Sequence, residues 1–259
     1  MALLIRTFYS RPEFLRIEQV GKRIRDRMTV ARDKDKTGRL TAKQSSKTTK
    51  REVATGVRPL RLDDQENGYL YVPVNYNRLT SAALAVMFHG AGATAEQGLS
   101  LIRRYADDNN ILIMAPASHA QSWDIIVDHN FGIDVSLLDQ ALAHVFEEFV
   151  IDSKHIGIGG FSDGASYALS LGLTNGDLFT HIIAFSPGFA YTVEKRGIPA
   201  VFMSHGIDDP VLPIDPCGRR IAPLLREQGL ALEFKEFKGG HEIPDDISAS
   251  AVHWFLKAA

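Results

Sequence analysis

The chain has 259 residues, of which 45% are hydrophobic and 23% charged, and its formal net charge is −2. The first 55 residues carry an excess of about nine positive charges, so the remaining chain is acidic, which argues against nucleic acid as a partner. No apolar run approaches the roughly 20 residues of a membrane span, so we expect no stable membrane insertion. The single cysteine, Cys217, excludes an internal disulfide and fits a reducing compartment, and we therefore expect a cytoplasmic protein.

The first 55 residues are predicted to form a basic arm and linker, followed by one folded domain over residues 56–259. Apolar residues at helical spacing occur within 12–30, and residues 31–50 are polar and rich in Lys, Thr and Ser. An alternative stays open, because residues 1–12 contain arginines and hydroxyl side chains but no acidic residue, as organellar targeting segments do.

Beyond residue 56, predicted strands alternate with predicted helices. The strands are expected at 68–73, 82–88, 111–116, 155–161, 181–185, 199–204 and 232–237, and the helices at 95–109, 134–149, 165–173, 217–228 and 245–257. This alternation predicts an α/β fold with a mostly parallel central sheet flanked by helices. In such a sheet the functional site lies at the carboxyl ends of the strands.

One of these strand ends carries Gly160-Phe161-Ser162-Asp163-Gly164. The pattern Gly-x-Ser-x-Gly between a strand and a helix is typical of a nucleophile elbow, a strained turn that leaves no room for side chains two residues on either side of the serine. The simpler alternative is a Gly/Ser turn that caps a helix. The predicted strand before it and helix after it favour the elbow, with Ser162 as the candidate nucleophile.

A serine nucleophile needs a base and an acidic residue that orients the base, in the chain order Ser, Asp or Glu, His. Asp208 and Asp209 follow the predicted strand 199–204, and His241 follows the strand 232–237. We favour Asp209 over Asp208 because it lies against Pro210, deeper in the loop. His241 is the candidate base.

An acyl-transfer site also needs donors for the oxyanion. The backbone N–H of Asp163 is the first candidate, and that of Ala91, in the Gly/Ala-rich loop after strand 82–88, is the second. A loop of this kind can also hold phosphate, but no Gly-Lys-Ser/Thr follows it. No histidine spacing indicates a metal site, so we expect no bound metal.

These four motifs together resemble the α/β-hydrolase superfamily, and within it the phospholipase/carboxylesterase family, which includes acyl-protein thioesterases and lies near the dienelactone hydrolases. The likeness covers about residues 57–259. It implies a cofactor-free serine esterase with Ser162, Asp209 and His241 as its catalytic triad. Asp163 stands where acyl-protein thioesterases usually have Gln, which argues against activity on protein thioesters.

The expected function is therefore a serine carboxylic-ester hydrolase that acts on a small-molecule ester. A thioesterase or lysophospholipase of the same family, and a non-catalytic ligand-binding α/β-hydrolase, remain as alternatives; a homodimer is also open. Only about a dozen residues connect strands 181–185 and 199–204, too few for a cap domain. We therefore expect an open groove for short-to-medium acyl chains, with the substrate-binding residues Gly90, Trp123, Phe131 and Phe189. Core packing is the alternative role of Trp123.

Overall fold

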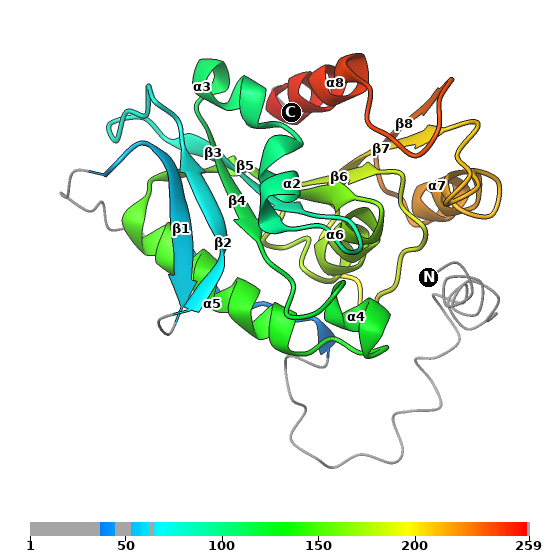
Figure 1. Ribbon diagram of the computed structural model, residues 1–259, viewed down its shortest axis with the longest axis horizontal. Helices are drawn as coiled ribbons and strands as arrows, with labels where there is room; N and C mark the ends of the chain where they lie inside the picture. Colours follow the sequence, from blue (N-terminus) through cyan, green and yellow to red (C-terminus); the bar gives the residue numbers. More distant parts are fainter. Residues whose placement is uncertain (1–36, 45–52, 63–64, 258–259) are drawn as a thin grey trace, which may run out of the picture.

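The computed structural model describes residues 37–44, 53–62 and 65–257. Their centre is an eight-stranded sheet with the strand order β1-β2-β4-β3-β5-β6-β7-β8 (Figure 1). The strands are β1 (Gly56–Leu62), β2 (Gln65–Val72), β3 (Ala82–Phe88), β4 (Ile111–Pro116), β5 (Ile151–Phe161), β6 (His181–Phe185), β7 (Ala200–Gly206) and β8 (Leu232–Phe237).

The sheet is antiparallel at one edge and parallel elsewhere. Strand β1 pairs antiparallel with β2, and β2 with β4, whereas the pairs from β4 through β8 are all parallel. Every residue of β3 and β4 is buried, as expected for apolar strands covered on both faces. The predicted mostly parallel sheet is confirmed. Because its parallel strands run in the same direction, their carboxyl ends all lie on the same side of the molecule.

Helices cover both faces of the sheet, and alternate residues of one strand enter different cores. Leu84, Val86 and Phe88 of β3 pack in a core with α5 (Ile133–Glu148), α6 (Asp163–Thr174) and α7 (Gly218–Glu227). Ala85 and Met87 pack in the second core, with α8 (Asp245–Leu256). Figure 1 shows α8 on one side of the sheet and α5 on the other.

The prediction of one long helix over residues 95–109 is wrong, because the chain there forms three short helical segments. They are α2 (Ala95–Ser100), the 3₁₀ turn η3 (Arg103–Tyr105) and α3 (Ala106–Asn109). Ile102 leaves the helical conformation with φ −136° and is fully buried, and Arg104 then reaches Asp245 of α8 in an ion pair at 2.7 Å. The break places the Ile102 side chain in the second core, and burial of this apolar side chain offsets the helical hydrogen bonds that are not made. The expected loop before α5 also contains a short helix, α4 (Asp124–Val127).

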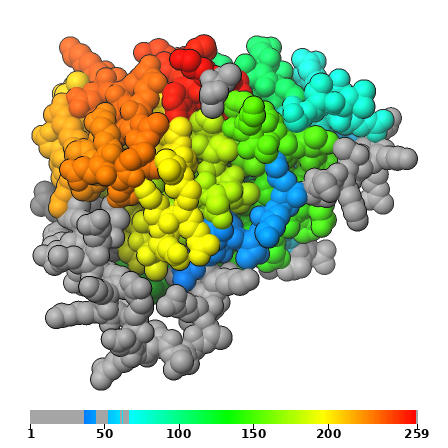
Figure 2. Space-filling model, turned by 180° about the vertical axis from the view of Figure 1, so that it is seen from behind, coloured from blue at the N-terminus to red at the C-terminus, as the bar shows by residue number. Residues whose placement is uncertain are grey.

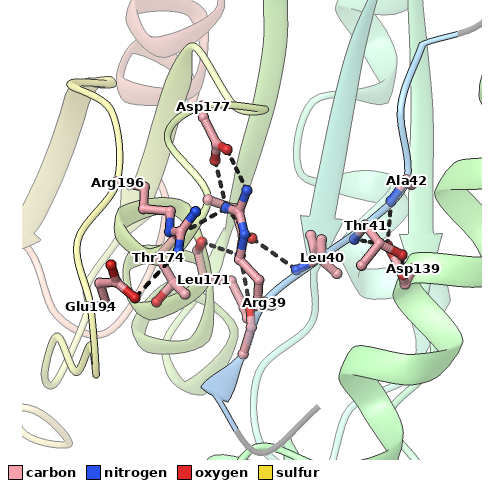
Figure 3. A network of polar contacts seen from close by, with 12 residues as sticks. Arg39, Leu40, Thr41, Ala42, Asp139, Leu171, Thr174, Asp177, Glu194 and Arg196 are labelled. Atoms are coloured by element: carbon pink, nitrogen blue, oxygen red, sulfur yellow. Dashed lines mark hydrogen bonds and ion pairs between the residues drawn. The ribbon is translucent and has the colours of Figure 1, made fainter. Parts of the chain in front are cut away.

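Residues 37–44 do not form the solvated linker expected from their composition. They cross the surface beside α5 and the segment after α6 (Figure 2), and Leu40 is buried. Arg39 forms a two-pronged ion pair with Asp177 (Figure 3). Its guanidinium also donates to the Asn175 side chain at 3.0 Å. Hydrogen bonds from Thr41 to Asp139 fix the segment to α5.

The arm prediction is therefore wrong for residues 37–44, which form part of the packed domain. The predicted amphipathic helix within 12–30 and the alternative targeting segment at 1–12 lie outside the described residues. Within the described ranges, no helix is long and apolar enough to cross a membrane.

Candidate active site

Ser162 lies at the turn between β5 and α6, at the carboxyl edge of the sheet. Its backbone has φ 57° and ψ −118°, a conformation that a non-glycine residue rarely adopts and that stores strain. A hydrogen bond from Ser162 N to Phe185 O, 2.9 Å long, anchors the turn to the end of β6. The turn thus presents the serine hydroxyl above the sheet, as the sequence pattern predicts.

The two glycines of the motif are required by close backbone contacts. A Cβ atom on Gly160 would lie 2.6 Å from backbone atoms of Gly164, and a Cβ atom on Gly164 would lie 2.4 Å from Phe88 O. Real Cβ atoms do not approach backbone oxygen so closely. The absence of side chains therefore lets α6 begin directly against the end of β3.

His241 lies between Ser162 and Asp209. Its Nδ1 atom is 2.6 Å from Asp209 Oδ2, and its Nε2 atom is 2.8 Å from Ser162 Oγ. A carboxylate only accepts hydrogen bonds, so Nδ1 carries the proton and Nε2 is left to accept from the serine hydroxyl. The ring of Phe161, 4.7 Å away between centroids, packs beside the imidazole. An imidazole nitrogen that can accept a proton is thus held in contact with a hydroxyl group.

Asp209 is held rigidly by its own loop. Its side chain is fully buried, and its Oδ1 atom accepts hydrogen bonds from the N–H groups of Val211 and Leu212 at 2.9 and 2.8 Å. The other oxygen is left for His241. Asp208, the alternative acid, is exposed and contributes its backbone N–H to Gly239 O instead.

The loop after β3 lies directly beside the elbow. A Cβ atom on Gly90 would be 3.4 Å from Ser162 Cβ. On both sides of Ala91 the backbone N–H groups have acceptors: Gly90 N donates to Gln97 Oε1 at 2.8 Å, and Gly92 N donates to Gln121 O at 2.7 Å. The loop therefore leaves the Ala91 N–H as its candidate donor to a ligand.

The side chain of His89 orients that peptide group. Ser118 N donates to His89 Nε2 at 3.2 Å, so Nδ1 carries the ring proton and donates to Gly90 O at 2.8 Å. Burial lowers the pKa of His89, which keeps the ring neutral. Because the N–H of a trans peptide points away from its C=O, this contact turns the Ala91 N–H to the opposite side.

Asp163 supplies the first N–H group of α6, which has no acceptor within the helix. Its side chain, 8% exposed, accepts a hydrogen bond from Ser122 Oγ at 2.6 Å. Burial raises the pKa of this carboxyl, and the hydrogen bond from Ser122 opposes the shift. Sequence reasoning missed Ser122, because no spacing connects it with a residue 41 positions later.

Two of the expected groove residues belong to the core instead. Trp123 is 1% exposed and Phe131 is 2% exposed, so neither lines an open groove. The Trp123 ring stacks on Tyr167 of α6 at 4.9 Å, and Phe131 packs near the same tyrosine. Burial of these large apolar rings stabilises the fold more than their exposure in a substrate groove would. The groove prediction is therefore wrong at both positions. Phe189 is also buried, at 6% exposure.

The described residues contain no group of three or more His, Cys, Asp or Glu side chains that could hold a metal ion. Cys217, at the N-terminal end of α7, is buried, and this burial raises the pKa of its thiol to about 12. Its side chain is therefore unsuited to act as a nucleophile.

Comparison with known proteins identifies the fold and the family. A family model described as Phospholipase/Carboxylesterase matches residues 124–258, about half of the chain, from α4 through α8. The chain belongs to the phospholipase/carboxylesterase family. The predicted resemblance to this family is thus confirmed, although residues 1–123 lie outside the matched part.

Named relatives of this family member are esterases. Proteins named probable feruloyl esterase C from Aspergillus flavus and Aspergillus oryzae are 27% and 28% identical to it over 163 residues, or 60% of this chain. The matched region spans 58% of the length of those relatives.

Solved structures share the fold of this phospholipase/carboxylesterase family member. A thermostable esterase superposes with a TM-score of 0.64 at 20% identity, covering 77% of this chain and 62% of the other. The phospholipase/carboxylesterase from Dyadobacter fermentans superposes with a TM-score of 0.57 at 22% identity, covering 74% and 97%.

Proposed function

We propose that this protein is a serine carboxylic-ester hydrolase that works through an acyl-enzyme, with Ser162 as nucleophile, His241 as general base and Asp209 as the acid that orients it. The observation that carries the proposal is the continuous pair of contacts at 2.8 Å and 2.6 Å from the serine hydroxyl through the imidazole to the buried carboxylate. The family and its esterase relatives support the same chemistry.

The reaction proceeds in two halves. His241 Nε2 takes the proton of Ser162 as Oγ attacks the ester carbonyl carbon, and the resulting oxyanion accepts hydrogen bonds from the N–H groups of Ala91 and Asp163. The tetrahedral intermediate collapses, the ester C–O bond breaks, and the leaving alcohol takes the proton from His241. Water then gives a proton to His241 and attacks the acyl carbon. The bond between that carbon and Ser162 Oγ breaks, Oγ takes the proton back from His241, and the carboxylic acid leaves. Asp209 holds the imidazole in the productive tautomer throughout.

The substrate is an ester with a short-to-medium acyl group. The connection from Phe185 of β6 to Ala200 of β7 is too short to hold a cap domain over the site, which favours access by soluble esters. Because two relatives are named feruloyl esterases, an aromatic acyl group belongs in the test panel. A steady rise in turnover of p-nitrophenyl esters from acetate to palmitate would contradict the acyl-length proposal.

We propose that the enzyme is cytoplasmic and has no nucleic-acid partner. Whether it forms a homodimer is left to experiment. Cys217, the single cysteine of the sequence, leaves no internal disulfide, which supports a reducing compartment. Fractionation of the source cells tests the compartment, and light scattering of the full chain tests whether it forms a homodimer. Recovery of the protein in an organelle would favour the targeting-segment alternative for residues 1–12.

The deciding experiment is labelling with a fluorophosphonate probe, combined with ester hydrolysis, in the wild type and in Ser162→Ala. The wild type should take up one probe per chain at Ser162. The variant should lose labelling and several orders of magnitude in kcat while keeping its unfolding temperature.

The matched control is Ser248→Ala on α8, which should keep both probe labelling and ester hydrolysis. An unlabelled, inactive wild type would favour the ligand-binding alternative, and efficient hydrolysis of thioesters over oxygen esters would favour the thioesterase.

A further inference from the structure

Two consecutive residues, Ser122 and Trp123, hydrogen-bond to the two segments that carry the candidate oxyanion donors. Ser122 Oγ donates to Asp163 Oδ2 at 2.6 Å, beside the N–H group of Asp163. Trp123 Nε1 donates to His89 O at 2.9 Å, two residues before Ala91. The preceding residue, Gln121, accepts from Gly92 N just beyond Ala91. One short stretch of chain therefore touches the elbow on one side and the Ala91 loop on the other.

These contacts are shielded from water. Ser122 is 4% exposed and Trp123 is 1% exposed, so water competes little for either donor. The Trp123 ring lies 4.7 Å from Phe88, the last residue of β3, and stacks on Tyr167 of α6 at 4.9 Å. The indole is thus wedged between the strand that leads to the Ala91 loop and the helix that begins at Asp163, which fixes where its N–H group points.

The spacing between the two oxyanion donors needs such a connection. Ala91 and Asp163 belong to different loops, and the sheet aligns them only as far as the pairing of Phe88 with Gly160. Beyond that pair, the two loops meet only through van der Waals contacts such as that of Gly90 with Ser162, and among the described residues no hydrogen bond joins them directly. A bridge that bonds to both loops sets the separation between their N–H groups, on which stabilisation of the oxyanion depends.

We propose that Ser122 and Trp123 are positioning residues of the oxyanion hole, which hold the Asp163 and Ala91 N–H groups at the distance that the tetrahedral oxyanion requires. This inference rests on the proposed function. It assigns Trp123 a role different from the groove wall expected from the sequence, because its indole N–H acts through the backbone of His89 and its ring does not meet the substrate. A loose bridge should impair binding of the transition state while leaving binding of the ester intact.

The test compares Ser122→Ala and Trp123→Phe with two controls of the same chemistry on α8, Ser248→Ala and Trp254→Phe. Ser248 is equally buried, at 3% exposure, and its hydroxyl is also hydrogen-bonded, and Trp254 is the second of the two tryptophans. For each variant, kcat and KM are measured with a short-chain ester, and the inhibition constant is measured with a trifluoromethyl ketone, which forms a tetrahedral oxyanion adduct with serine.

Ser122→Ala and Trp123→Phe should each lower kcat by about 10-fold to 100-fold, with KM changed less than about threefold. The inhibition constant of the trifluoromethyl ketone should rise by the same factor as kcat falls. Ser122→Thr, which keeps a hydroxyl, should recover most of the loss. The α8 controls should stay within about twofold of the wild type in all three quantities.

The outcomes separate this inference from the proposed function. Labelling of the wild type by the fluorophosphonate probe is measured first, and a wild type that neither reacts nor hydrolyses esters would overturn both. A reactive wild type whose Ser122→Ala and Trp123→Phe variants keep their kcat and inhibitor affinity would overturn the bridge alone. The bridge would also be overturned if a variant unfolds at a lower temperature but keeps wild-type kcat and inhibitor affinity while it is folded. Should Trp123→Phe fail to fold, the smaller change in Ser122→Ala still decides.

Discussion

The Nε2 atom of His205 lies 3.5 Å from Asp209 Oδ2, the same oxygen that contacts His241. His205 is fully buried in β7, and its Nε2–H donates to Leu212 O at 2.7 Å. Burial lowers the pKa of its ring, so the imidazole is neutral. Since the Leu212 N–H holds the other oxygen of Asp209, this single ring ties together both ends of the loop that carries the carboxylate.

Replacing His205 should therefore weaken catalysis through Asp209. We expect His205→Ala to lower kcat/KM about tenfold or more, because the carboxylate loses a fixed loop, and to cost about 1–3 kcal/mol in the free energy of unfolding. Steady-state kinetics and urea unfolding measure the two effects. His205→Gln, which restores a donor to Leu212 O, should recover part of both, and full activity in His205→Ala would refute the supporting role.

Arg39 fastens residues 37–44 to the domain. Its guanidinium contacts Asp177, the Asn175 side chain and Thr174 O, so Arg39→Ala should cost about 1–3 kcal/mol in the free energy of unfolding. It should also speed tryptic cleavage after Lys43, measured by mass spectrometry. The control Arg196→Ala removes an exposed ion pair with Glu194 and should cost no more than about 1 kcal/mol. Equal cleavage rates in Arg39→Ala and wild type would contradict the packed segment.

Thiol reagents should not inactivate the native enzyme. Cys217 is 3% exposed, and burial raises the pKa of its thiol to about 12, so the reactive thiolate is absent near neutral pH. We expect no reaction with a disulfide reagent such as DTNB in the folded protein and one thiol per chain after unfolding in guanidinium. Rapid stoichiometric labelling of the native enzyme, or loss of activity with it, would show that the thiol is accessible.

His181 should make the fold sensitive to mild acid. Burial, and then the neighbouring His155, lower its pKa from 6.5 to about 4. Because the folded pKa lies below the unfolded one, the neutral ring contributes stability that is fully present above pH 6.5 and is lost as the pH falls through 4. The contribution to the free energy of unfolding is about 3 kcal/mol.

Urea unfolding between pH 4 and pH 7 tests this contribution. His181→Phe keeps a ring against Phe255 and Trp254 and should flatten the loss of stability over that range. Its control, His144→Gln, removes an exposed imidazole on α5 and should keep the wild-type slope. An unchanged slope in His181→Phe would contradict the assignment.

The sequence alone determined the fold class and the convergence of Ser162, Asp209 and His241. Each of the three follows a predicted strand, and parallel strands bring their carboxyl ends to one edge of a sheet, so order along the chain became proximity in space. The need for glycine on both sides of Ser162 could also be predicted from the sequence, because a turn so close to the end of β3 leaves no space for side chains.

Only the tertiary structure decided which loop residues face the substrate and which belong to the core. Trp123 and Phe131 lie in a stretch without periodicity, so their burial depends on Tyr167 and Phe88, contributed by other elements. The polar residues 37–44 resembled a linker because the partners that hold them, Asp139 and Asp177, lie about a hundred residues or more along the chain. Local composition records propensity, whereas burial and hydrogen bonding across such separations exist only once the sheet and its helices have assembled.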